Sequence, residues 1–520
     1  MGMVAPEQRI ASAFVVFCGG YGDVRRQALE RGVCRQRLYR EADWVWVRVD
    51  GMQWQEEKAR LCQRIRELEE LNRQWQERLT QVVVLDQDKQ AEFACVGQAM
   101  GVSLPELKTL LEVLGGAPSV ATLGRWTQEA GKKSAALLEV LDELTRPCVQ
   151  QVVADEIYVS RPALMMVEPE SLCWVTGHLT EHVDGLTWAE EFERLPHLEQ
   201  VTRDAGSGLT KGVVELNCRR EEQGKPAVAD QLDHFHTLRE GGRGVGRAER
   251  AAKRAWSAAE KAEADKAQRQ RHGQPLTGCS NRLRARWAQA TEAVRLWDER
   301  EKVWQKTKEA LTLFTPDGQL NTRARAEAIL AATLPQLPDQ TFGTTKRMLQ
   351  QPQTLTYLDE IQRKLQALPV PAEVRQAAVR QEGLRRRPEA LQGDSAQAAA
   401  LRGILLVCAV ILAKAGEVGK QAVKAVRAIL RSSWRASSLV ECVNSVLRMQ
   451  QARHRKMSQG LIDLKRLYWN CHRFRTGRRR GRTPYELLDI PWPQGLRWWD
   501  VLKWSPEQLR DKLSARTRAA

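Results

Sequence analysis

Strand-forming sequence in this chain is confined to one block, residues 149–236. The block opens with VQQVVADEIYVS, which is rich in β-branched residues, and continues through ALMMVE, SLCWVTG, LEQVTRD and PAVADQL. The proline-bearing turn EPES joins two of these segments, and helical patterns begin at Thr187 and cover 211–216. Strands followed by alternating strand and helix predict an α/β domain with a mixed, five-stranded sheet.

The strand signals disappear from about residue 238 to residue 430. This stretch holds the charged, alanine-rich segment AERAAKRAWSAAEKAEADKAQRQR and further helical patterns at 284–311, 322–334 and 355–365. Its most apolar run, GILLVCAVILA at 403–413, is too short to span a bilayer, so we interpret it as a buried helix and expect no membrane partner. The whole stretch is predicted to be one helical insertion.

Helical patterns also fill the N-terminal part. Residues 5–48 predict three short helices with a turn at Gly32, and Arg35, Arg37 and Arg40 fall on the candidate recognition helix of a helix-turn-helix. A plain helical hairpin is the alternative. Residues 54–80 have the spacing of a short coiled coil, for dimerisation or for packing within the chain. A second helical DNA-binding unit is predicted at 86–146, where Ser103 and Ser119 cap helices and Arg125 lies early in the second.

Charge and cysteine usage limit the class of protein. The 520 residues have 81 Lys and Arg against 64 Asp and Glu, a net charge of +17, which favours a polyanionic partner, most often nucleic acid. The alternative is a soluble enzyme that is basic without binding nucleic acid. The 11 cysteines include no CxxC pair and no zinc-type spacing with histidine, so we expect reduced thiols in a reducing cytosol. No secretory leader is expected from the first residues.

Three acids occupy positions that carboxylates usually avoid. Asp155 lies in the middle of an apolar strand, Asp204 ends a strand just before a glycine turn, and Glu441 sits in SSLVECVNSVLRMQQARHRK at the border of an apolar helical stripe. Each alone fits a turn former or a surface acid. Clustered carboxylates bind hard cations, and two Mg²⁺ ions stabilise the charge that develops in phosphodiester cleavage. We expect the stripe of this late helix to pack on the sheet edge.

The C-terminal part is basic and aromatic. Between Arg431 and Asp489 there are 14 Lys and Arg against four Asp and Glu, interleaved with Tyr468, Trp469, Phe474 and Tyr485. Such a pattern is typical of a surface that binds nucleic-acid phosphates and bases, with a solvated surface as the alternative.

These features together resemble the DDE transposases of bacterial insertion sequences, which have an RNase H-like core. An Asp on the first strand, an Asp on a later strand and a Glu beyond a helical insertion carry the resemblance, which covers roughly residues 145–490. Asp233-His234-Phe235-His236 is similar to the Asp-x-x-His signature of Mutator-like and hAT-related groups. The tail DLKRLYWNCHRFRTGRRRGRTPYELL resembles the end of such transposases.

The resemblance implies roles for individual residues. Asp155, Asp204 and Glu441 would be metal ligands for two Mg²⁺ ions, which Mn²⁺ can replace. His236 would lie beside the scissile phosphate, and Asp233 would start its helix. A packed histidine is the alternative for His236, and a surface arginine for Arg448, a candidate phosphate contact. Asn444 is a weaker candidate. The expected DNA-binding residues are Arg35, Arg37, Arg40, Arg125, Arg448, Arg453, Arg455, Lys456, Arg473, Arg475, Arg478, Arg479 and Arg480.

The implied organisation is an α/β RNase H-like core interrupted by a large all-α insertion and preceded by helix-turn-helix domains. The implied activity is 3′-end cleavage and strand transfer on double-stranded DNA, by a homodimer or larger synaptic complex in a prokaryotic cytoplasm, on the nucleoid. The predicted segments are 1–50 (helix-turn-helix), 51–85 (coiled coil or linker helix), 86–146 (second helical DNA-binding domain), 147–237 (core, first part), 238–430 (insertion), 431–490 (core, second part) and 491–520 (C-terminal tail).

Rival interpretations remain open. An RNase H-like nuclease or resolvase without strand transfer would use the same acids, and a transposase-derived DNA-binding protein would have lost catalysis. A zinc hydrolase built on His234 and His236 is disfavoured, because two histidines two residues apart do not share a helix face and no third ligand has a natural spacing.

Overall fold

The computed structural model describes residues 5–20, 22–49, 53–79, 85–159, 161–393, 395–451, 457–493 and 495–517. The chain divides into two compact units, Met1–Leu85 and Asp86–Ala520. Each unit is described by itself. The predicted DNA contacts Arg453, Arg455 and Lys456 lie outside the described residues.

The first unit is helical, as predicted. Gly32, with a φ of 61°, makes the expected turn between the second and third helices. The long fourth helix covers the predicted coiled coil, and its Ile65, Leu68 and Leu71 are about half exposed. DNA binding and dimerisation by this unit stay predictions. The helices are α1 (Pro6–Cys18), α2 (Asp23–Glu30), α3 (Arg35–Val49) and α4 (Gln53–Leu79).

The second unit is built around a five-stranded mixed sheet, which confirms the predicted α/β class. The sheet order is β3-β2-β1-β4-β5. The first three strands pair antiparallel, whereas β4 and β5 run parallel to β1. The strands are β1 (Gln151–Tyr158), β2 (Pro162–Val167), β3 (Trp174–Leu179), β4 (Gln200–Arg203) and β5 (Ala229–Leu232).

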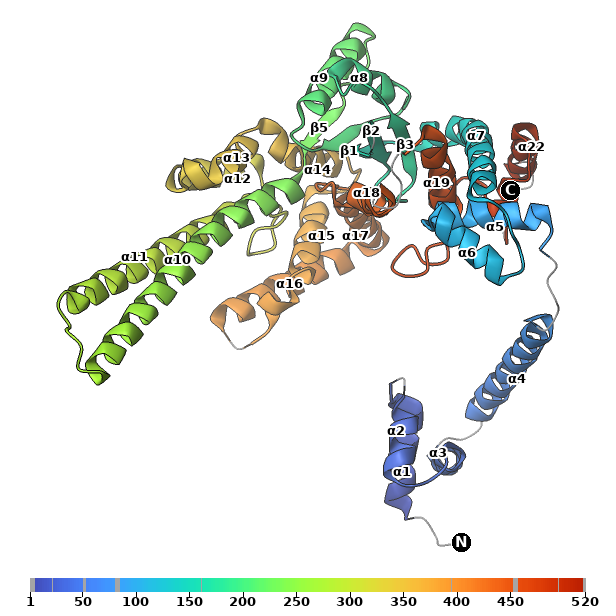
Figure 1. Ribbon diagram of the computed structural model, residues 1–520, viewed down its shortest axis with the longest axis horizontal. Coiled ribbons are helices and arrows are strands. Elements are labelled where there is room, and N and C mark those ends of the chain that lie inside the picture. The colour runs from blue at the N-terminus through green and yellow to red at the C-terminus, as the bar shows by residue number, and fades with distance from the viewer. Residues whose placement is uncertain are drawn as a thin grey trace. The chain divides into compact units, whose positions relative to one another are not determined.

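Helices cover both faces of the sheet (Figure 1). On one face, α8 (Gly185–Glu193) and α9 (Ser207–Glu222) bury apolar side chains against β1, β2 and β4. On the other face lie α18 (Ser438–Gln451) and α19 (Gln459–Cys471). The α9 helix is much longer than the predicted 211–216. The α18 stripe packs on this face through Val440, Val443 and Leu447, so its predicted place at the sheet edge was wrong.

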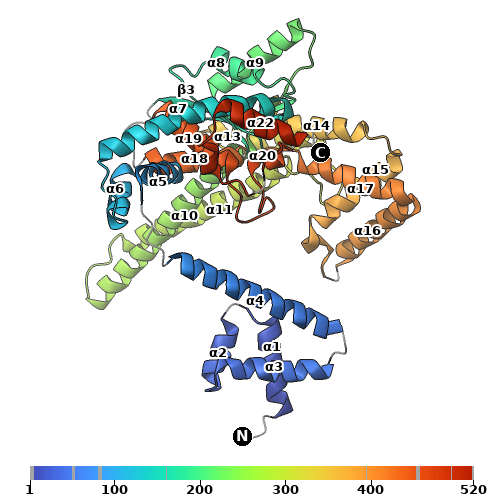
Figure 2. The same ribbon diagram turned by 90° about the vertical axis from the view of Figure 1, so that its right-hand side faces the viewer.

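The helices of residues 86–148 share a buried cluster with the C-terminal helices, although the sequence suggested separate segments. Figures 1 and 2 both show α7 beside α19, and Gly131 and Gly460 permit the close approach because an added Cβ at Gly131 would lie 2.7 Å from the Gly460 carbonyl oxygen. Ser103 and Ser119 cap α6 and α7, as predicted. The helices are α5 (Gln87–Met100), α6 (Leu104–Val113), α7 (Val120–Thr145), η1 (Arg146–Cys148), α20 (Pro484–Leu487), α21 (Trp498–Val501) and α22 (Pro506–Thr517).

The aromatic residues of the basic tail serve this packing. Tyr485 is 1% exposed, and Trp469 donates its indole N–H to the Leu172 carbonyl at 2.8 Å. Trp469 and Phe474 pack against the apolar side chains beneath the sheet, and Tyr468 packs against the cluster around α7. Tyr485 is therefore a core residue, whereas Tyr468, Trp469 and Phe474 are partly buried, and their predicted role in nucleic-acid binding stays a prediction.

Between β5 and α18 the described residues are helical, as predicted, with an isolated antiparallel bridge between Phe314 and Leu320. The two longest helices, α10 and α11, form an antiparallel hairpin (Figure 1). The remaining helices share their own buried core. The elements are α10 (His234–Arg271), α11 (Cys279–Glu309), α12 (Arg323–Thr333), η2 (Leu334–Gln336), α13 (Asp339–Leu349), η3 (Pro352–Leu355), α14 (Thr356–Gln366), α15 (Ala372–Arg385), η4 (Pro388–Leu391), α16 (Ala396–Lys414) and α17 (Gly416–Arg431).

The prediction that residues 403–413 form a buried helix was half wrong. The helix exists as α16, and it packs on α15 and α17 along one side, so Leu406, Val407 and Val410 on the other side remain 66%, 57% and 45% exposed. Among the described residues, α16 is the one helix that is long and apolar enough to cross a membrane, judged by length and composition alone. About 22% of it is buried inside the protein.

Both edges of the sheet are covered by later parts of the chain. At the β3 edge, the Asn470 Oδ1 accepts from the Trp174 N–H and the Gln459 Oε1 accepts from the Leu179 N–H, both at 2.8 Å. At the β5 edge, the Gln231 side chain accepts from the Tyr357 N–H at 2.7 Å and donates to the Thr354 carbonyl at 3.2 Å.

Candidate active site

Asp155 is buried in the central strand and faces α18. Along β1, Val153 and Ile157 pack on the α18 side, and Val152 and Ala154 pack on the α8–α9 side, so the alternation turns Asp155 toward α18. The residue is 6% exposed. Its Oδ1 accepts from the N–H of the next residue at 2.9 Å, and its Oδ2 accepts from the Asn444 Nδ2 at 2.6 Å.

Strand register brings Asp204 beside Asp155. Because Ala154 pairs with Arg203 in the parallel β1–β4 ladder, the residues that follow each of them reach the same level of neighbouring strands. Asp204 is held by a turn in which its Oδ1 accepts from the Gly206 N–H at 2.8 Å. Asp204 therefore lies directly after the end of β4, as the sequence predicted.

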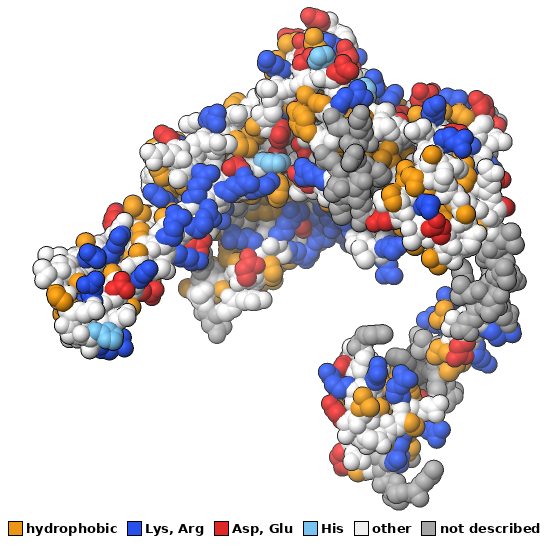
Figure 3. Space-filling view, viewed as in Figure 1, with side chains coloured by type: hydrophobic (Ala, Val, Ile, Leu, Met, Phe, Trp, Pro, Cys, Tyr) orange, Lys and Arg blue, Asp and Glu red, His pale blue; other side chains and the backbone are white. Residues whose placement is uncertain are grey.

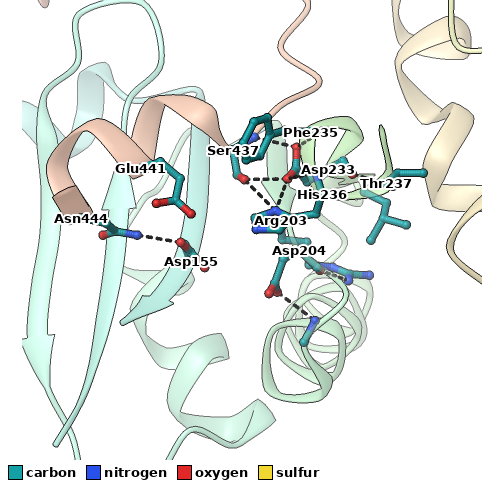
Figure 4. A network of polar contacts seen from close by, with 12 residues as sticks. Asp155, Arg203, Asp204, Asp233, Phe235, His236, Thr237, Ser437, Glu441 and Asn444 are labelled. Carbon is teal, nitrogen blue, oxygen red and sulfur yellow. Dashed lines mark hydrogen bonds and ion pairs between the residues drawn. The ribbon is translucent and has the colours of Figure 1, made fainter. Parts of the chain in front are cut away.

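Glu441 approaches from α18 and extends toward Asp155 (Figure 4). It lies in the first turn of the helix, on the border of the buried stripe, with its side chain 22% exposed. Arg448, two turns later, donates to the Glu441 Oε2 at 2.9 Å. The predicted phosphate contact is thus paired with the predicted metal ligand in this structure.

The charge of Asp155 is poorly balanced. Burial and the negative charges of Asp204 and Glu441 raise the pKa of Asp155 from 3.8 to about 7, against partial lowering by the Glu156 N–H and His236. Glu156 itself points to the other face, where its Oε1 accepts from the Trp188 indole N–H at 2.9 Å, as the alternation predicts. Two acids thus act on one buried carboxyl, whose negative charge would be stabilised by a cation.

Asp233 organises the start of α10. It caps the helix by accepting from the Phe235 N–H at 2.7 Å and the His236 N–H at 3.0 Å, which confirms that it starts this helix. Ser437 reaches it from beyond the insertion, donating its N–H and its hydroxyl at 2.8 and 2.7 Å. Burial alone would raise the pKa of Asp233, but bonds from His236, Ser437 and Phe235 together lower it.

His236 is held between this cap and the acids. Its Nδ1 shares a hydrogen bond with the Asp233 Oδ2, and that bond raises the pKa of His236 against the effect of burial. The charges of Asp155 and Asp204 raise the same pKa, which places the ring near both acids. His234, by contrast, is buried, and its Nε2 forms a hydrogen bond with the Thr354 carbonyl at 2.8 Å. His234 therefore contacts the helical insertion, whereas His236 faces the acids.

The carboxylates do not form a three-ligand cluster. Within the described residues, no three His, Cys, Asp or Glu side chains are grouped closely enough to hold one ion. Mg²⁺ keeps several waters and needs only one or two protein carboxylates. A further oxygen is at hand, because the buried Asn444 Oδ1 has no hydrogen-bond partner among the residues that the structure describes.

Two residues of the site escaped the sequence analysis. Arg203 is fully buried behind Asp204, donating from Nη1 to the Asp204 carbonyl at 2.9 Å and from Nη2 to Asp230 at 2.6 Å, so it fixes the turn that carries Asp204. An arginine at the end of a short strand, directly before Asp204, was the available signal for it. Ser437 had no comparable signal, since its partner Asp233 is 204 residues away in the sequence.

The other predicted DNA contacts lie on other elements. Arg35, Arg37 and Arg40 are exposed on α3 of the first unit, with Arg37 paired to Glu41 at 3.2 Å. Arg125 is exposed on α7.

In the basic tail, three arginines already have protein partners. Arg473 pairs with Glu486 at 2.7 Å, and Arg479 donates to the Glu170 and Pro169 carbonyls. Arg478 lies over the Trp434 ring and pairs with Glu170 at 3.4 Å, while Arg475 and Arg480 are exposed.

Two comparisons with known proteins do not assign the chain to a family. A scan against protein-family models and a search of curated proteins found no match to the chain. The functional interpretation therefore rests on the site itself.

Proposed function

We propose that the protein is a DDE transposase of a bacterial insertion sequence, with an RNase H-like core. The observation that carries the proposal is the placement of Asp204 and Glu441 on either side of the buried carboxyl of Asp155, whose pKa is raised to about 7. The strand order, with three antiparallel strands followed by two parallel ones and helices on both faces, supports the core assignment. The proposed setting is the cytoplasm of a prokaryote, on the nucleoid.

Each residue of the site has a defined task in this proposal. Asp155 with Asp204 would hold one Mg²⁺, and Asp155 with Glu441 a second; Mn²⁺ can replace either. Bound there, the ions would stabilise the charge that develops on the attacking and leaving oxygens of a phosphodiester. Arg203 keeps the Asp204 turn in place from behind. His236, whose pKa is raised by Asp233, would lie beside the scissile phosphate, where its hydrogen bond to Asp233 favours the protonated ring.

The same site would act twice on DNA. Hydrolysis at the transposon end would release a 3′-OH, and that hydroxyl would attack target DNA in a second in-line displacement. The proposed ends are recognised by the α2–α3 pair, whose Arg35, Arg37 and Arg40 are exposed. Pairing of two ends requires a dimer or larger synaptic complex, for which the exposed Ile65, Leu68 and Leu71 of α4 suit a coiled coil.

A strand-transfer assay tests the proposal. The purified full chain is incubated with Mg²⁺ and duplex oligonucleotides copied from the genomic DNA on either side of the gene, together with a supercoiled target plasmid. The expected products are a nicked donor with a 3′-OH and a covalent donor–target joint. Hydrolysis without a joined product would instead identify a nuclease or resolvase. Absence of cleavage with both Mg²⁺ and Mn²⁺, with binding retained, would identify a silent DNA-binding protein.

A further inference from the structure

The helix that begins at the candidate active site also carries a row of basic side chains. The first turn of α10 holds His236 in the site, and the helix then continues as one arm of the α10–α11 hairpin. Figure 3 shows Lys and Arg side chains gathered on this hairpin. The exposed basic residues that form the row, called here the α10 stripe, are Arg239, Arg243, Arg247, Arg250, Arg254 and Lys261.

The stripe lies on one face of the helix. At about 100° per residue, its six side chains fall within an arc of roughly 80°, and His236 falls inside the same arc. Between Arg239 and Lys261, the other position inside this arc is Ser257, and the positions roughly 20° outside it are Glu240, Gly246 and Ala258. The arc itself therefore holds no acid from the active site outward, and the one acid at its border, Glu240, pairs with Arg243.

The opposite face of α10 is used for packing, which fixes the direction of the stripe. Gly241 and Gly244 lie against Trp304 and Phe342, where an added Cβ would collide with either ring. Ala248 and Ala252 continue this buried face at 4% and 1% exposure. These small residues lie roughly 140° around the helix from the stripe, so α11 and α13 hold the stripe outward.

The charges of the stripe are largely uncompensated within the protein. Arg243 pairs with Glu240. In the part of the chain that the structure describes, the remaining five stripe residues take part in no ion pair. Acids on other faces of the hairpin are instead paired with neighbours outside the stripe, as Glu249 is with Lys253 at 2.6 Å. A row of unpaired like charges costs electrostatic energy unless a polyanion neutralises it.

The dimensions of the stripe match a duplex. From Arg239 to Lys261 the helix rises about 33 Å at ~1.5 Å per residue, close to the ~34 Å of one turn of B-DNA. Arginine and lysine without interleaved aromatic rings suit phosphates, whereas single strands are usually bound with rings that stack on bases. The exposed Trp256 is not an exception, because it packs edge-on against Trp287 of α11.

We propose that the α10 stripe binds the phosphate backbone of a DNA duplex along about one helical turn and leads that duplex to His236 and the carboxylates. This deepens the proposed function, on which it rests for the identity of the nucleic acid. The contacts of the stripe do not depend on base sequence. The length of the stripe determines how far the bound duplex must extend from the scissile phosphodiester. Duplexes that end at the scissile position would lose these contacts.

Salt-dependent binding tests the stripe. The variant R247Q/R250Q/R254Q removes three charges, and R247K/R250K/R254K keeps them. The matched control K253Q/R269Q/R271Q removes three exposed charges from α10 outside the stripe. Binding of a labelled 30-bp duplex is measured by anisotropy in EDTA at several salt concentrations, and thermal unfolding checks that each variant is folded.

The glutamine stripe variant is expected to bind at least roughly tenfold more weakly, and the slope of log K against log salt should fall by about 2–3, at ~0.9 per lost phosphate contact. The lysine variant and the control should keep the wild-type slope. Equal losses in stripe and control variants, an unchanged stripe variant, or a preference for single strands would each overturn the inference. A wild type that binds through the stripe but never cleaves contradicts the proposed function alone; one that cleaves while the stripe variant binds normally contradicts the stripe alone.

Discussion

Asp155 and Asp233 are both buried aspartates of the same α/β core, yet their pKa values move in opposite directions. Asp233 accepts from two backbone N–H groups of α10, from His236 and twice from Ser437, so its pKa is lowered despite burial. Asp155 accepts from one neighbouring N–H and one amide, and two other acids face it, so its pKa rises to about 7. The partners, not the depth of burial, decide whether a buried carboxylate is a structural anchor or a site open to a cation.

The largest expected effect separates the two aspartates by catalysis. Asp155→Asn should lower cleavage about 10³-fold, because a loss of ~4 kcal/mol of charge stabilisation corresponds to roughly that factor in rate. Single-turnover cleavage of end oligonucleotides with Mg²⁺ measures it. The control is Asp463→Asn on α19, a carboxyl whose pKa is also raised by burial but which bonds Gln459 away from the site. Equal losses in both variants would contradict a special role for Asp155.

Asp233→Asn should damage folding more than any other change at the site. The amide offers one acceptor oxygen, so donors from Ser437 and α10 lose their charged partner, at a cost of ~3 kcal/mol in the free energy of unfolding. Because the pKa of Asp233 is lowered on folding, its contribution is present above the unfolded value of 3.8 and is lost as pH falls through the lower folded value. Denaturant unfolding at pH 7 and at pH 3 should show the difference shrink in acid; a constant difference would contradict this view of Asp233.

Asp155→Asn should have the opposite sign in stability. The folded state holds the Asp155 proton up to about pH 7 and the unfolded state only up to 3.8, so stability falls as pH rises between these values and the full cost remains above pH 7. Removing the charge should therefore stabilise the metal-free protein by ~2 kcal/mol at pH 8, about half of what three pKa units imply, and by nothing below pH 4. Thermal unfolding in EDTA across pH measures this. A variant less stable than wild type at pH 8 would show that the charge is already balanced.

Asn444→Ala should have a smaller effect on both properties. It removes the donor to Asp155 and the unpartnered Oδ1, and should cost ~1 kcal/mol of stability and raise the Mg²⁺ concentration for half-maximal cleavage by roughly 10-fold. Ser445→Ala is the matched control, since its exposed hydroxyl bonds the Cys442 carbonyl on the same helix. An unchanged Mg²⁺ requirement would exclude Asn444 from the cation environment.

Arg448→Gln is expected to change stability least. The Arg448–Glu441 pair is exposed at 52% and 22%, so its loss should cost at most ~0.5 kcal/mol. Denaturant unfolding tests this value, and Arg448→Lys serves as the charge-conserving control. A cost above about 2 kcal/mol would mean that Glu441 needs Arg448 as an anchor, which would make it resemble Asp233 more than Asp155.

The sequence predicted the sheet and the positions of the acids, because both follow from local patterns. Strand alternation turned Asp155 toward one face, and a strand end before a glycine turn located Asp204. Partners that depend on long-range packing were not predictable. Ser437 contacts Asp233 only because the chain comes back to the sheet after the helical insertion. The exposure of α16 depends on which helices pack against it, and an apolar run in the sequence does not specify those neighbours. The burial of Tyr485 was missed for the same reason, since composition does not distinguish a core ring from an exposed one.

The sheet's covered edges have a consequence for synthesis. Strand edges left open can pair with another chain and start aggregation. Here the β5 edge is closed by Thr354 and Tyr357, and the β3 edge by side chains as late as Asn470. A nascent chain that has made all five strands still lacks both covers until more than 100 further residues have been added for one edge and more than 200 for the other. We therefore expect that chains truncated before residue 470, which lack the cover of the β3 edge, self-associate more readily than the full chain.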